Sequence, residues 1–340
     1  MADPLPTVSR EVHLIARPAG QAALSNFAVT TVDVQPPKSG EILVRNSWLS
    51  VDPYMRGRMN DAESYVAPFA IDAPLEGGAV GTVLASNSAE VPVGSIVLHD
   101  HGWRELATLT AEQARVVDVS RAPARMYLSV LGMTGLTAYI GLTEIAPVCE
   151  GDVVFISGAA GAVGTVAARV ARELGASWIV GSAGGNEKAR RLVDDFGFDA
   201  GIDYKAGSLH AQLSAAAPDG IDVYFDNVGG DHLHAALAKI RRHGRVALCG
   251  AIASYDSNTR PSIDNLILAI GKRITLRGYI VTDHYARWDE YVTQAIGWLR
   301  DGSLRYEETV VEGIDQVASA FIGLLHGHNT GKMLVHVGPD

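Results

Sequence analysis

The chain has 340 residues, a length that predicts about two domains at roughly 150 residues per domain. Apolar residues make up 47% of it and charged residues 19%, a composition that excludes a disordered or fibrous protein. The net charge of −10 argues against a nucleic-acid-binding protein, which needs a basic face. The two cysteines, Cys149 and Cys249, are too few for a disulfide framework or a cysteine-rich zinc module.

The sequence predicts neither a membrane-spanning segment nor a secretory signal. Gly, Ser, Asp or Arg interrupts each long apolar stretch before it reaches the roughly 18 residues of a membrane span. Residues 1–14 contain no apolar region after a basic cluster, so no secretory signal is predicted. These features, with the isolated cysteines, predict a cytoplasmic protein that binds neither membrane nor nucleic acid.

Residues 1–125 are typical of a compact, mostly antiparallel β domain. Segments 11–18, 27–34 and 40–51 are rich in β-forming residues, and Pro and Gly separate them. Two further short strands are predicted at 76–86 and 94–100.

The pattern changes near Ala124, where apolar residues begin to recur at helical spacing. From Gly151 to about Val281, predicted strands alternate with predicted helices. Such alternation indicates βαβ crossovers and a parallel sheet that is covered on both faces. We therefore predict an α/β protein with a doubly wound domain over 126–304, and a C-terminal part, 305–340, whose last strand returns to the first domain.

A glycine-rich turn follows the predicted strand at 152–157 and opens a helix. Gly161 lacks the Cβ that would block a phosphate, and Gly164 allows the helix to pack closely on the strand. Ala159 replaces the first glycine of the usual dinucleotide pattern. The turn predicts a pyrophosphate site, with an ordinary strand-to-helix turn as the alternative.

The end of the next strand favours NADP(H) over NAD(H) as the cofactor. NAD sites place a carboxylate about 20 residues beyond the glycines, and no carboxylate directly follows this strand. Lys188 and Arg191 lie one helical turn apart, and their charges, with Ser182 as a donor, suit a ribose 2′-phosphate. The alternative is that both cations belong to a solvated helix face.

A β-rich first domain followed by a late dinucleotide fold resembles the medium-chain dehydrogenases/reductases. Zinc-dependent members need a cysteine-like ligand early in the chain and a Gly-His-Glu pair later. Residues 51–56 and 76–78 of this chain supply neither, and His99 and His101 are more simply turn histidines than ligands. We predict that no metal is bound.

The chain resembles one zinc-free subgroup more closely, on motifs spread over most of its length. They are 51–59 (VDPYMRGRM), 132–142 (GMTGLTAYIGL), 159–164 (AAGAVG), 224–230 (YFDNVGG), 249–252 (CGAI) with Tyr255, and 331–333 (GKM). The subgroup contains prostaglandin reductases, plant alkenal double-bond reductases and bacterial curcumin reductases. The resemblance implies NADPH-dependent reduction of the C=C bond of α,β-unsaturated ketones and aldehydes, a GroES-like first domain and a homodimer.

The resemblance also implies the cofactor-binding residues. They are Gly161, Ala162, Val163 and Gly164 at the pyrophosphate, Lys188 and Tyr204 at the ribose phosphate, Asn227 near the cofactor, and Cys249, Ala251, Ile252, Tyr255, Tyr279, Val281 and Asn329 at the nicotinamide half. Alternatives remain: Tyr204 as a strand-end aromatic residue, Asn227 as a turn residue and Cys249 as an apolar filler. The Gly184-Gly185 pair could shift Lys188, and the subgroup pattern assigns no substrate role to 60–71.

The inferred reaction transfers hydride to the β-carbon of an enone, so that negative charge develops on the carbonyl oxygen. Tyr255 follows the fifth strand of the doubly wound domain, where ligands of such folds bind, and its phenol can donate to that oxygen together with a cofactor ribose hydroxyl. Tyr54 and Arg56 are further catalytic candidates that would close the cleft from the first domain, with a structural ion pair as the alternative for Arg56. A zinc-free quinone reductase and a non-catalytic NADPH-binding sensor are the competing functions.

Overall fold

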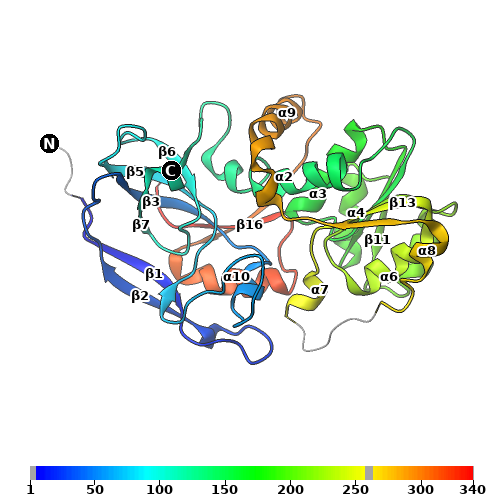
Figure 1. Ribbon diagram of the computed structural model, residues 1–340, viewed down its shortest axis with the longest axis horizontal. Coiled ribbons are helices and arrows are strands. Elements are labelled where there is room, and N and C mark those ends of the chain that lie inside the picture. Colours follow the sequence, from blue (N-terminus) through cyan, green and yellow to red (C-terminus); the bar gives the residue numbers. More distant parts are fainter. Residues whose placement is uncertain (1–4, 257–262, 340) are drawn as a thin grey trace. The chain divides into compact units, whose positions relative to one another are not determined.

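A computed structural model describes residues 5–256 and 263–339. The chain divides into two compact units (Figure 1). The first consists of Met1–Leu128, Thr309–Asn329 and Met333–Asp340, and the second of Ser129–Glu308 and Thr330–Lys332. The short segment Thr330–Lys332 therefore belongs to the second unit, although the residues on both sides of it belong to the first.

The described residues of the first unit form two antiparallel sheets. The larger has the order β15-β16-β3-β5-β6-β8, with β7 also paired to β3, and the smaller has the order β2-β1-β4. Their bounds are β1 Val8–Leu14, β2 Phe27–Asp33, β3 Glu41–Ser50, β4 Ala73–Pro74, β5 Ala79–Ser86, β6 Ile96–His99, β7 Leu106–Thr110, β8 Arg115–Val116, β15 Glu308–Glu312 and β16 Lys332–His336. Pairing of Leu334 in β16 with Ser50 in β3 shows that the C-terminal strand completes this sheet.

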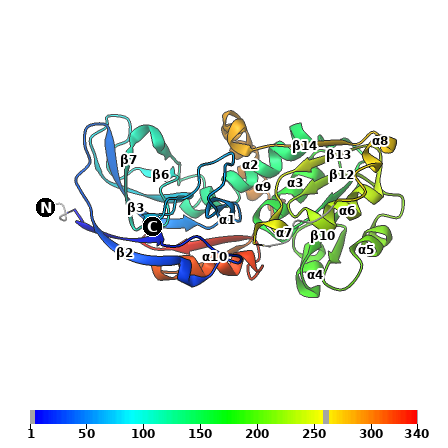
Figure 2. The ribbon, with the colours of Figure 1, turned by 60° about the horizontal axis from the view of Figure 1, so that its bottom comes forward.

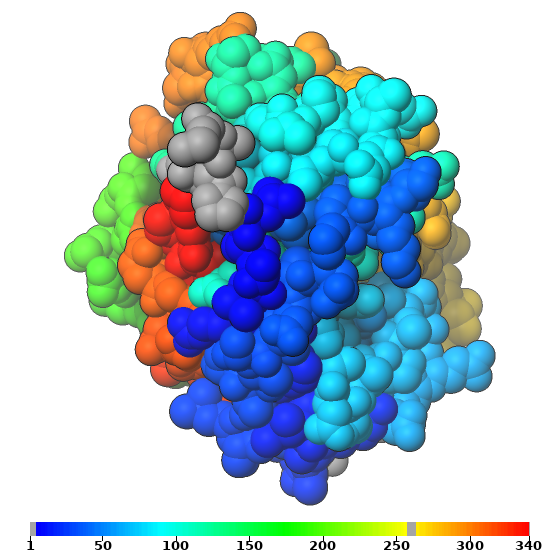
Figure 3. Space-filling view, turned by 90° about the vertical axis from the view of Figure 1, so that its left-hand side faces the viewer, coloured from blue at the N-terminus to red at the C-terminus, as the bar shows by residue number. Residues whose placement is uncertain are grey.

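An aromatic cluster forms the centre of the first unit's core. Trp103 is completely buried, and its ring centre lies 5.8 Å from that of Phe27 and 5.6 Å from that of Phe321 in α10 (Val317–Leu325). Helix α10 thus packs on the sheets through residues that are far from them in sequence. On the face in Figure 3, the red C-terminal segment lies beside this orange helical region and the blue N-terminal strands.

The second unit contains a parallel sheet with the order β11-β10-β9-β12-β13-β14 in the described part of the chain. The strands are β9 Val153–Ile156, β10 Trp178–Ala183, β11 Ala200–Asp203, β12 Ile221–Asp226, β13 Ile240–Leu248 and β14 Thr275–Gly278. The helices include α2 Met133–Ile140, α3 Ala162–Glu173, α4 Asn186–Asp194, α5 Leu209–Ala216, α6 Gly230–Lys239, α7 Ile252–Tyr255, α8 Leu268–Lys272 and α9 Trp288–Arg300. Figure 2 shows helices on both sides of the sheet, which confirms the predicted doubly wound fold.

Side-chain alternation along β10 shows how the two faces are covered. Val180 packs in a core with Leu213 of α5 and Ala236 of α6. Its neighbour Gly181 points to the opposite face, where a Cβ would lie 2.7 Å from the ring of Phe198. The chain order reverses between β9 and β12, and in such folds ligands bind at the carboxyl ends of the strands beside this reversal.

No helix in the described ranges has both the length and the apolar character that crossing a membrane requires.

Candidate active site

The glycine-rich turn after β9 has the geometry of a phosphate cradle. Gly161 is the N-cap of α3, and no side chain caps the helix there. A Cβ at Gly161 would meet only the carbonyl oxygen of Gly158, at 3.2 Å, so the outer side of the turn has room for a ligand. A Cβ at Gly164 would lie 2.6 Å from Ala159 Cα, so this position must stay free of a side chain for α3 to pack. Ala162 and Val163 supply amides of the first helical turn, which favour an anion.

A short C-terminal segment docks on this turn. The amide of Gly331 donates to the carbonyl oxygen of Ala160 at 2.8 Å, and Gly331 forms a parallel bridge with Gly161. Gly331 has a φ of +66°, and a Cβ there would collide with the backbone of Glu307. These contacts explain why the first residue of the GKM motif, Gly331, is a glycine. The predicted nicotinamide residue Asn329 ends the preceding segment of the first unit and is half-buried.

Lys188, Tyr204 and Lys205 form a cluster, here called the phosphate cluster, around the turn between β10 and α4. A Cβ at Gly184 would lie 3.0 Å from both Tyr204 Oη and Lys205 Cε, so the turn is glycine because these side chains cover it. Lys205 Nζ lies 5.9 Å from the centre of the Tyr204 ring, as in a cation–π contact. Burial lowers the pKa of Lys188, and the positive charge of Lys205 lowers it further. Two like charges at one turn favour a bound anion.

Lys205 was missed by the sequence analysis, although it directly follows Tyr204 at the end of β11. Its position at a strand end, directly after the predicted site residue Tyr204, is the sequence feature that could have identified it. Asp203 links the two parts of the phosphate cluster, because its Oδ1 accepts hydrogen bonds from the amides of Gly185 at 2.8 Å and Lys205 at 3.0 Å.

Arg191 does not join the phosphate cluster, contrary to the sequence prediction. Its guanidinium pairs with Glu307, and its Nε donates to Asp195 Oδ2 at 2.6 Å. Both carboxylates raise the pKa of Arg191. Ser182 lies fully buried in β10, and its Oγ has no hydrogen-bond partner among the described residues. Lys188 and Lys205 therefore remain the candidates for binding a phosphate at this turn.

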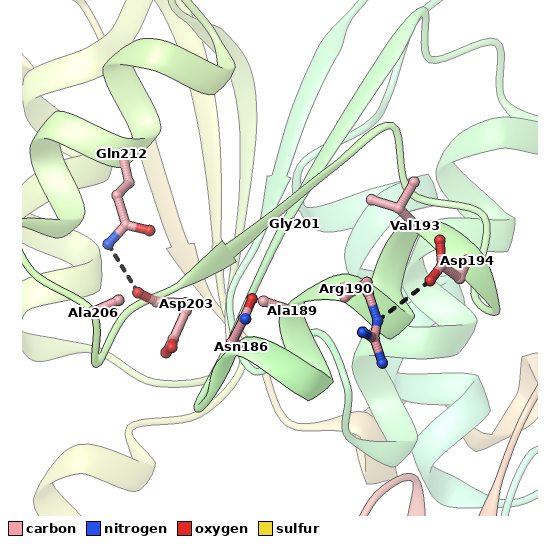
Figure 4. A pocket seen from close by; sticks show the side chains of 9 residues that line it. All are labelled: Asn186, Ala189, Arg190, Val193, Asp194, Gly201, Asp203, Ala206 and Gln212. Carbon is pink, nitrogen blue, oxygen red and sulfur yellow. Dashed lines mark hydrogen bonds and ion pairs between the residues drawn. The ribbon is translucent and has the colours of Figure 1, made fainter.

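A separate pocket of about 450 Å³ lies beyond the edge strand β11, between α4 and α5. It is lined by Asn186, Ala189, Arg190, Val193, Asp194, Gly201, Asp203, Ala206 and Gln212. Figure 4 shows Asp203 and Gln212 on one side and the Arg190–Asp194 ion pair, at 3.7 Å, on the other. Neither lysine of the phosphate cluster lines this pocket, although Asp203, which links the two parts of the cluster, lies in its wall.

At the end of β12, the carboxylate of Asp226 organises the turn into α6. It accepts hydrogen bonds from Tyr224 Oη at 2.6 Å and from the amides of Val228 and Gly229 at 3.0 and 2.7 Å. Burial raises the pKa of Asp226, while these hydrogen bonds act in the opposite direction. Asn227 donates from Nδ2 to the carbonyl oxygen of Ser157 at 2.7 Å, so its side chain fastens β12 to β9, as in the turn alternative.

Cys249 and Tyr279 lie at the ends of β13 and β14 and are both half-buried. Burial raises the pKa of the Cys249 thiol to about 12, which fits the predicted alternative of an apolar filler. Tyr279 Oη donates to the carbonyl oxygen of Thr137 in α2 at 2.7 Å, and burial raises its pKa well above the ordinary value. Val281, half-buried, begins a 3-10 helix at Val281–Arg287. The hydroxyl of Tyr279 is thus tied to α2.

Tyr255, at the end of α7, is placed as a hydrogen-bond donor. Its Oη accepts a hydrogen bond from the amide of Ala251 at 3.1 Å, which leaves the hydroxyl hydrogen for another acceptor. Burial raises the pKa of Tyr255, with Cys249 and Asp226 acting in the same direction, so the phenol is neutral at pH 7. Ala251 and Ile252, both half-buried, lie on the same turn.

In the first unit, Tyr54 and Arg56 lie at the short helix α1 (Met55–Arg58). Arg56 is buried, and its guanidinium donates to Asn60 Oδ1 at 2.9 Å and to the carbonyl oxygen of Gly20 at 2.5 Å. These contacts favour a structural role for Arg56. Burial raises the pKa of Tyr54, and the carboxylate of Asp52 raises it further.

The two histidines of the first unit occupy a turn. Burial lowers the pKa of His99 to about 3, and its Nδ1 accepts a hydrogen bond from the amide of His101 at 3.1 Å. Within the ranges that the structure describes, no three His, Cys, Asp or Glu side chains form a group that could hold a metal ion.

Comparison with known proteins extends these observations. Residues 10–117 match a family described as the N-terminal domain of oxidoreductase, and residues 162–298 match one described as zinc-binding dehydrogenase. A Nicotiana tabacum protein named 2-alkenal reductase (NADP(+)-dependent) is 39% identical over 98% of this chain and 98% of its own. The NADPH-dependent curcumin reductase of Escherichia coli is 36% identical, again over 98% of both chains.

A solved structure agrees with these sequence relatives. The crystal structure of CurA from Vibrio vulnificus in complex with NADPH is 38% identical, with a TM-score of 0.92 over 97% of this chain and all of that one. Identity above one third along almost the whole length, with the same fold, shows common family membership. The chain belongs to the NADP-dependent oxidoreductases that include these alkenal and curcumin reductases, within the medium-chain dehydrogenase/reductase superfamily.

Proposed function

We propose that this protein catalyses the NADPH-dependent reduction of the C=C bond of α,β-unsaturated ketones and aldehydes. The names of its relatives describe NADP-dependent reductases of alkenals and of curcumin. The observation that carries the proposal is the hydroxyl of Tyr255, a neutral phenol at the carboxyl ends of the parallel strands that accepts from the Ala251 amide and has its own hydrogen to donate. Such a donor is what a carbonyl oxygen needs when negative charge develops on it.

The chain's own residues provide two anion sites for NADPH. The amides of Gly161–Gly164 suit the pyrophosphate, because the helix is uncapped and lacks a blocking Cβ. Lys188, Tyr204 and Lys205 suit the ribose 2′-phosphate. The remaining residues assigned to the nicotinamide half shape that end through backbone and packing. They are Asn227, Cys249, Ala251, Ile252, Tyr279, Val281 and Asn329.

When NADPH is bound in the site formed by these residues, its nicotinamide would supply a hydride for the β-carbon of the enone, and a proton from solvent would complete the reduction at the α-carbon. Tyr255 donates a hydrogen bond to the substrate carbonyl oxygen and stabilises the enolate that forms between these two events. Its hydroxyl stays protonated, because burial favours the neutral phenol. Tyr54 is the first unit's candidate for contact with the substrate.

The reaction requires no metal, because the ligand positions of zinc-dependent relatives hold other residue types. Residues 51–56 read Val-Asp-Pro-Tyr-Met-Arg and residues 76–78 read Glu-Gly-Gly, with no cysteine or histidine. Carbonyl polarisation therefore depends on hydrogen bonds.

We further propose that the protein is a cytoplasmic homodimer. Edge strand β14 follows a segment whose apolar side chains face solvent, with Leu266 52%, Ile267 68% and Ile270 73% exposed. An open sheet edge beside such a patch suits pairing with a second copy. Light scattering of the purified protein tests this, and Ile270→Glu is expected to shift a dimer toward monomer. A wild-type monomer at micromolar concentration would contradict the proposal.

A substrate panel that follows NADPH absorbance tests the function. We expect turnover of enones and 2-alkenals, unchanged by a chelator, with product analysis showing a saturated carbonyl. Faster turnover of quinones than of every enone would favour the quinone reductase. Absence of turnover on the whole panel, with NADPH still bound, would favour a sensor.

A further inference from the structure

We propose that Tyr224, a core residue of β12, is a positioning residue for Tyr255 and acts on it through the turn at Asp226–Val228. This inference rests on the proposed role of Tyr255. Tyr224 touches no group assigned to the cofactor or the substrate, so any effect on the reaction must pass through its neighbours.

Tyr224 is held rigidly from two sides. Its side chain is completely buried, and its ring stacks on that of Phe155 in β9, with ring centres 5.0 Å apart. Its Oη donates to Asp226 Oδ1 at 2.6 Å and lies 3.0 Å from Ser157 Oγ. The hydroxyl therefore joins the ends of two neighbouring strands, β9 and β12.

The groups that Tyr224 joins hold three consecutive amides of the turn. Asp226 Oδ1 accepts from the amides of Val228 and Gly229 at 3.0 and 2.7 Å. Ser157 Oγ accepts from the amide of Asn227 at 3.0 Å. Without the Tyr224 hydroxyl, the buried carboxylate would lose a donor and would have to reorganise around these amides.

Backbone hydrogen bonds connect the segment that carries Tyr255 to the same turn. The amides of Cys249 and Gly250 donate to the carbonyl oxygen of Asp226 at 2.9 and 3.0 Å. The amide of Ile252 donates to the carbonyl oxygen of Asn227 at 3.3 Å, and that of Ala253 to Val228 at 3.2 Å.

The last link in the chain is the hydrogen bond from the amide of Ala251 to Tyr255 Oη, at 3.1 Å. Any displacement of the Asp226–Val228 turn therefore moves the tyrosine hydroxyl, while the phosphate cluster lies on other elements of the sheet. The geometry therefore predicts a larger effect of Tyr224 on the rate of reaction than on cofactor affinity, because the two lysines assigned to the 2′-phosphate do not move with this turn.

Tyr224→Phe tests the proposal, because it removes the hydroxyl and keeps the ring on Phe155. We expect kcat for an enone to fall about tenfold, since small misplacements of a catalytic group are costly. The Kd for NADPH and the KM for the enone should stay within about twofold. Tyr291→Phe is the matched control: this tyrosine is also fully buried in the second unit and donates to the carbonyl oxygen of Val130 at 2.5 Å. It should lower the Tm without changing kcat.

The double variant separates positioning from general destabilisation. With Tyr255→Phe already present, Tyr224→Phe should cause little further loss of kcat, because the group it positions is gone. Losses that multiply would overturn the proposal, as would a kcat for Tyr224→Phe within twofold of wild type while Tyr255→Phe is impaired. Full kcat in Tyr255→Phe would instead refute the donor role of Tyr255 on which this inference rests, while enone reduction itself would stand.

Ser157→Ala tests the same hydrogen-bond network if Tyr224→Phe does not fold. It removes the acceptor of the Asn227 amide, the neighbour of Tyr224 Oη and a donor to Asp226 Oδ1 at 3.3 Å, and it keeps the hydrogen bond from Tyr224 to Asp226. We expect a loss of kcat of roughly threefold that disappears in the Tyr255→Phe background. An unchanged kcat in this variant would overturn the proposal.

Discussion

At the phosphate end of the candidate site, Lys188, Tyr204 and Lys205 meet as side chains over a turn that solvent reaches. At the reaction end, formed by Asp226–Val228 and Cys249–Tyr255, backbone hydrogen bonds and buried groups hold one phenol in place. Tyr204 is 41% exposed, whereas Tyr224 beneath the reaction end is completely buried. The first end recognises charge with separate, adjustable side chains. The second depends on a connected network.

This difference predicts how substitutions behave. Charges over an exposed turn act through space, are screened by salt and make partial contributions. Groups in a buried network share donors and acceptors, so the loss of one affects the others. Substitutions at the phosphate end should therefore change binding, and those at the reaction end should change rate.

The largest effect is expected for Tyr255→Phe. Removal of the hydroxyl should lower kcat and kcat/KM together by roughly ten- to hundredfold, because a principal donor of this kind is worth about 10²–10³ and the ribose hydroxyl shares the load. The ring remains, so NADPH affinity should hardly change. Steady-state kinetics on one enone, with NADPH binding followed by fluorescence, measure both quantities. A raised KM with unchanged kcat would make Tyr255 a substrate-positioning residue.

The same contrast explains what could be predicted from the sequence. The glycine turn, Lys188 and Tyr255 are local signals, because each directly follows a predicted strand end. The ion pair of Arg191 with Glu307 could not be predicted, because Glu307 is 116 residues away in the chain. The role of Asp226 was missed because Ser157, 69 residues away, reaches it only once β9 and β12 pair. Residue type and spacing indicate a site, whereas long-range hydrogen-bond partners depend on packing.

The next largest effect is expected for Lys188→Ala at the phosphate end. Its charge-assisted hydrogen bonds to a 2′-phosphate are worth about 1.5–3 kcal/mol, so the Kd for NADPH should rise at least about tenfold. The Kd for NADH, which lacks that phosphate, should stay nearly unchanged. Equal losses for the two cofactors in a binding titration would show that Lys188 does not recognise the phosphate.

A smaller effect is expected for Lys205→Ala. This lysine is exposed, so its contribution to NADPH binding should be about threefold and should shrink as salt is raised. Its removal should also raise the pKa of Lys188, because the positive charge of Lys205 helps to lower it. Arg190→Ala is the matched control. Arg190 lies on α4, the helix that carries Lys188, but it pairs with Asp194 and lines the pocket between α4 and α5. Equal effects of both variants would indicate nonspecific attraction of the cofactor.

The smallest effect concerns the two cysteines, and it probes the buried character of the reaction end directly. With a pKa of about 12, Cys249 has only about one thiolate in ten thousand molecules at pH 8, and the thiolate is the form that reacts. Cys149 is exposed. Iodoacetamide at pH 8 without cofactor should therefore label Cys149 and spare Cys249, with kcat unchanged, as mass spectrometry and a rate assay can show. In Cys149→Ser the label should disappear.

The reactive thiolate fraction of Cys249 rises tenfold per pH unit, so its labelling should begin only at strongly alkaline pH. Labelling of Cys249 at pH 8 at the rate of an exposed thiol would mean that its pKa is not raised, and the contrast between the two ends would fail.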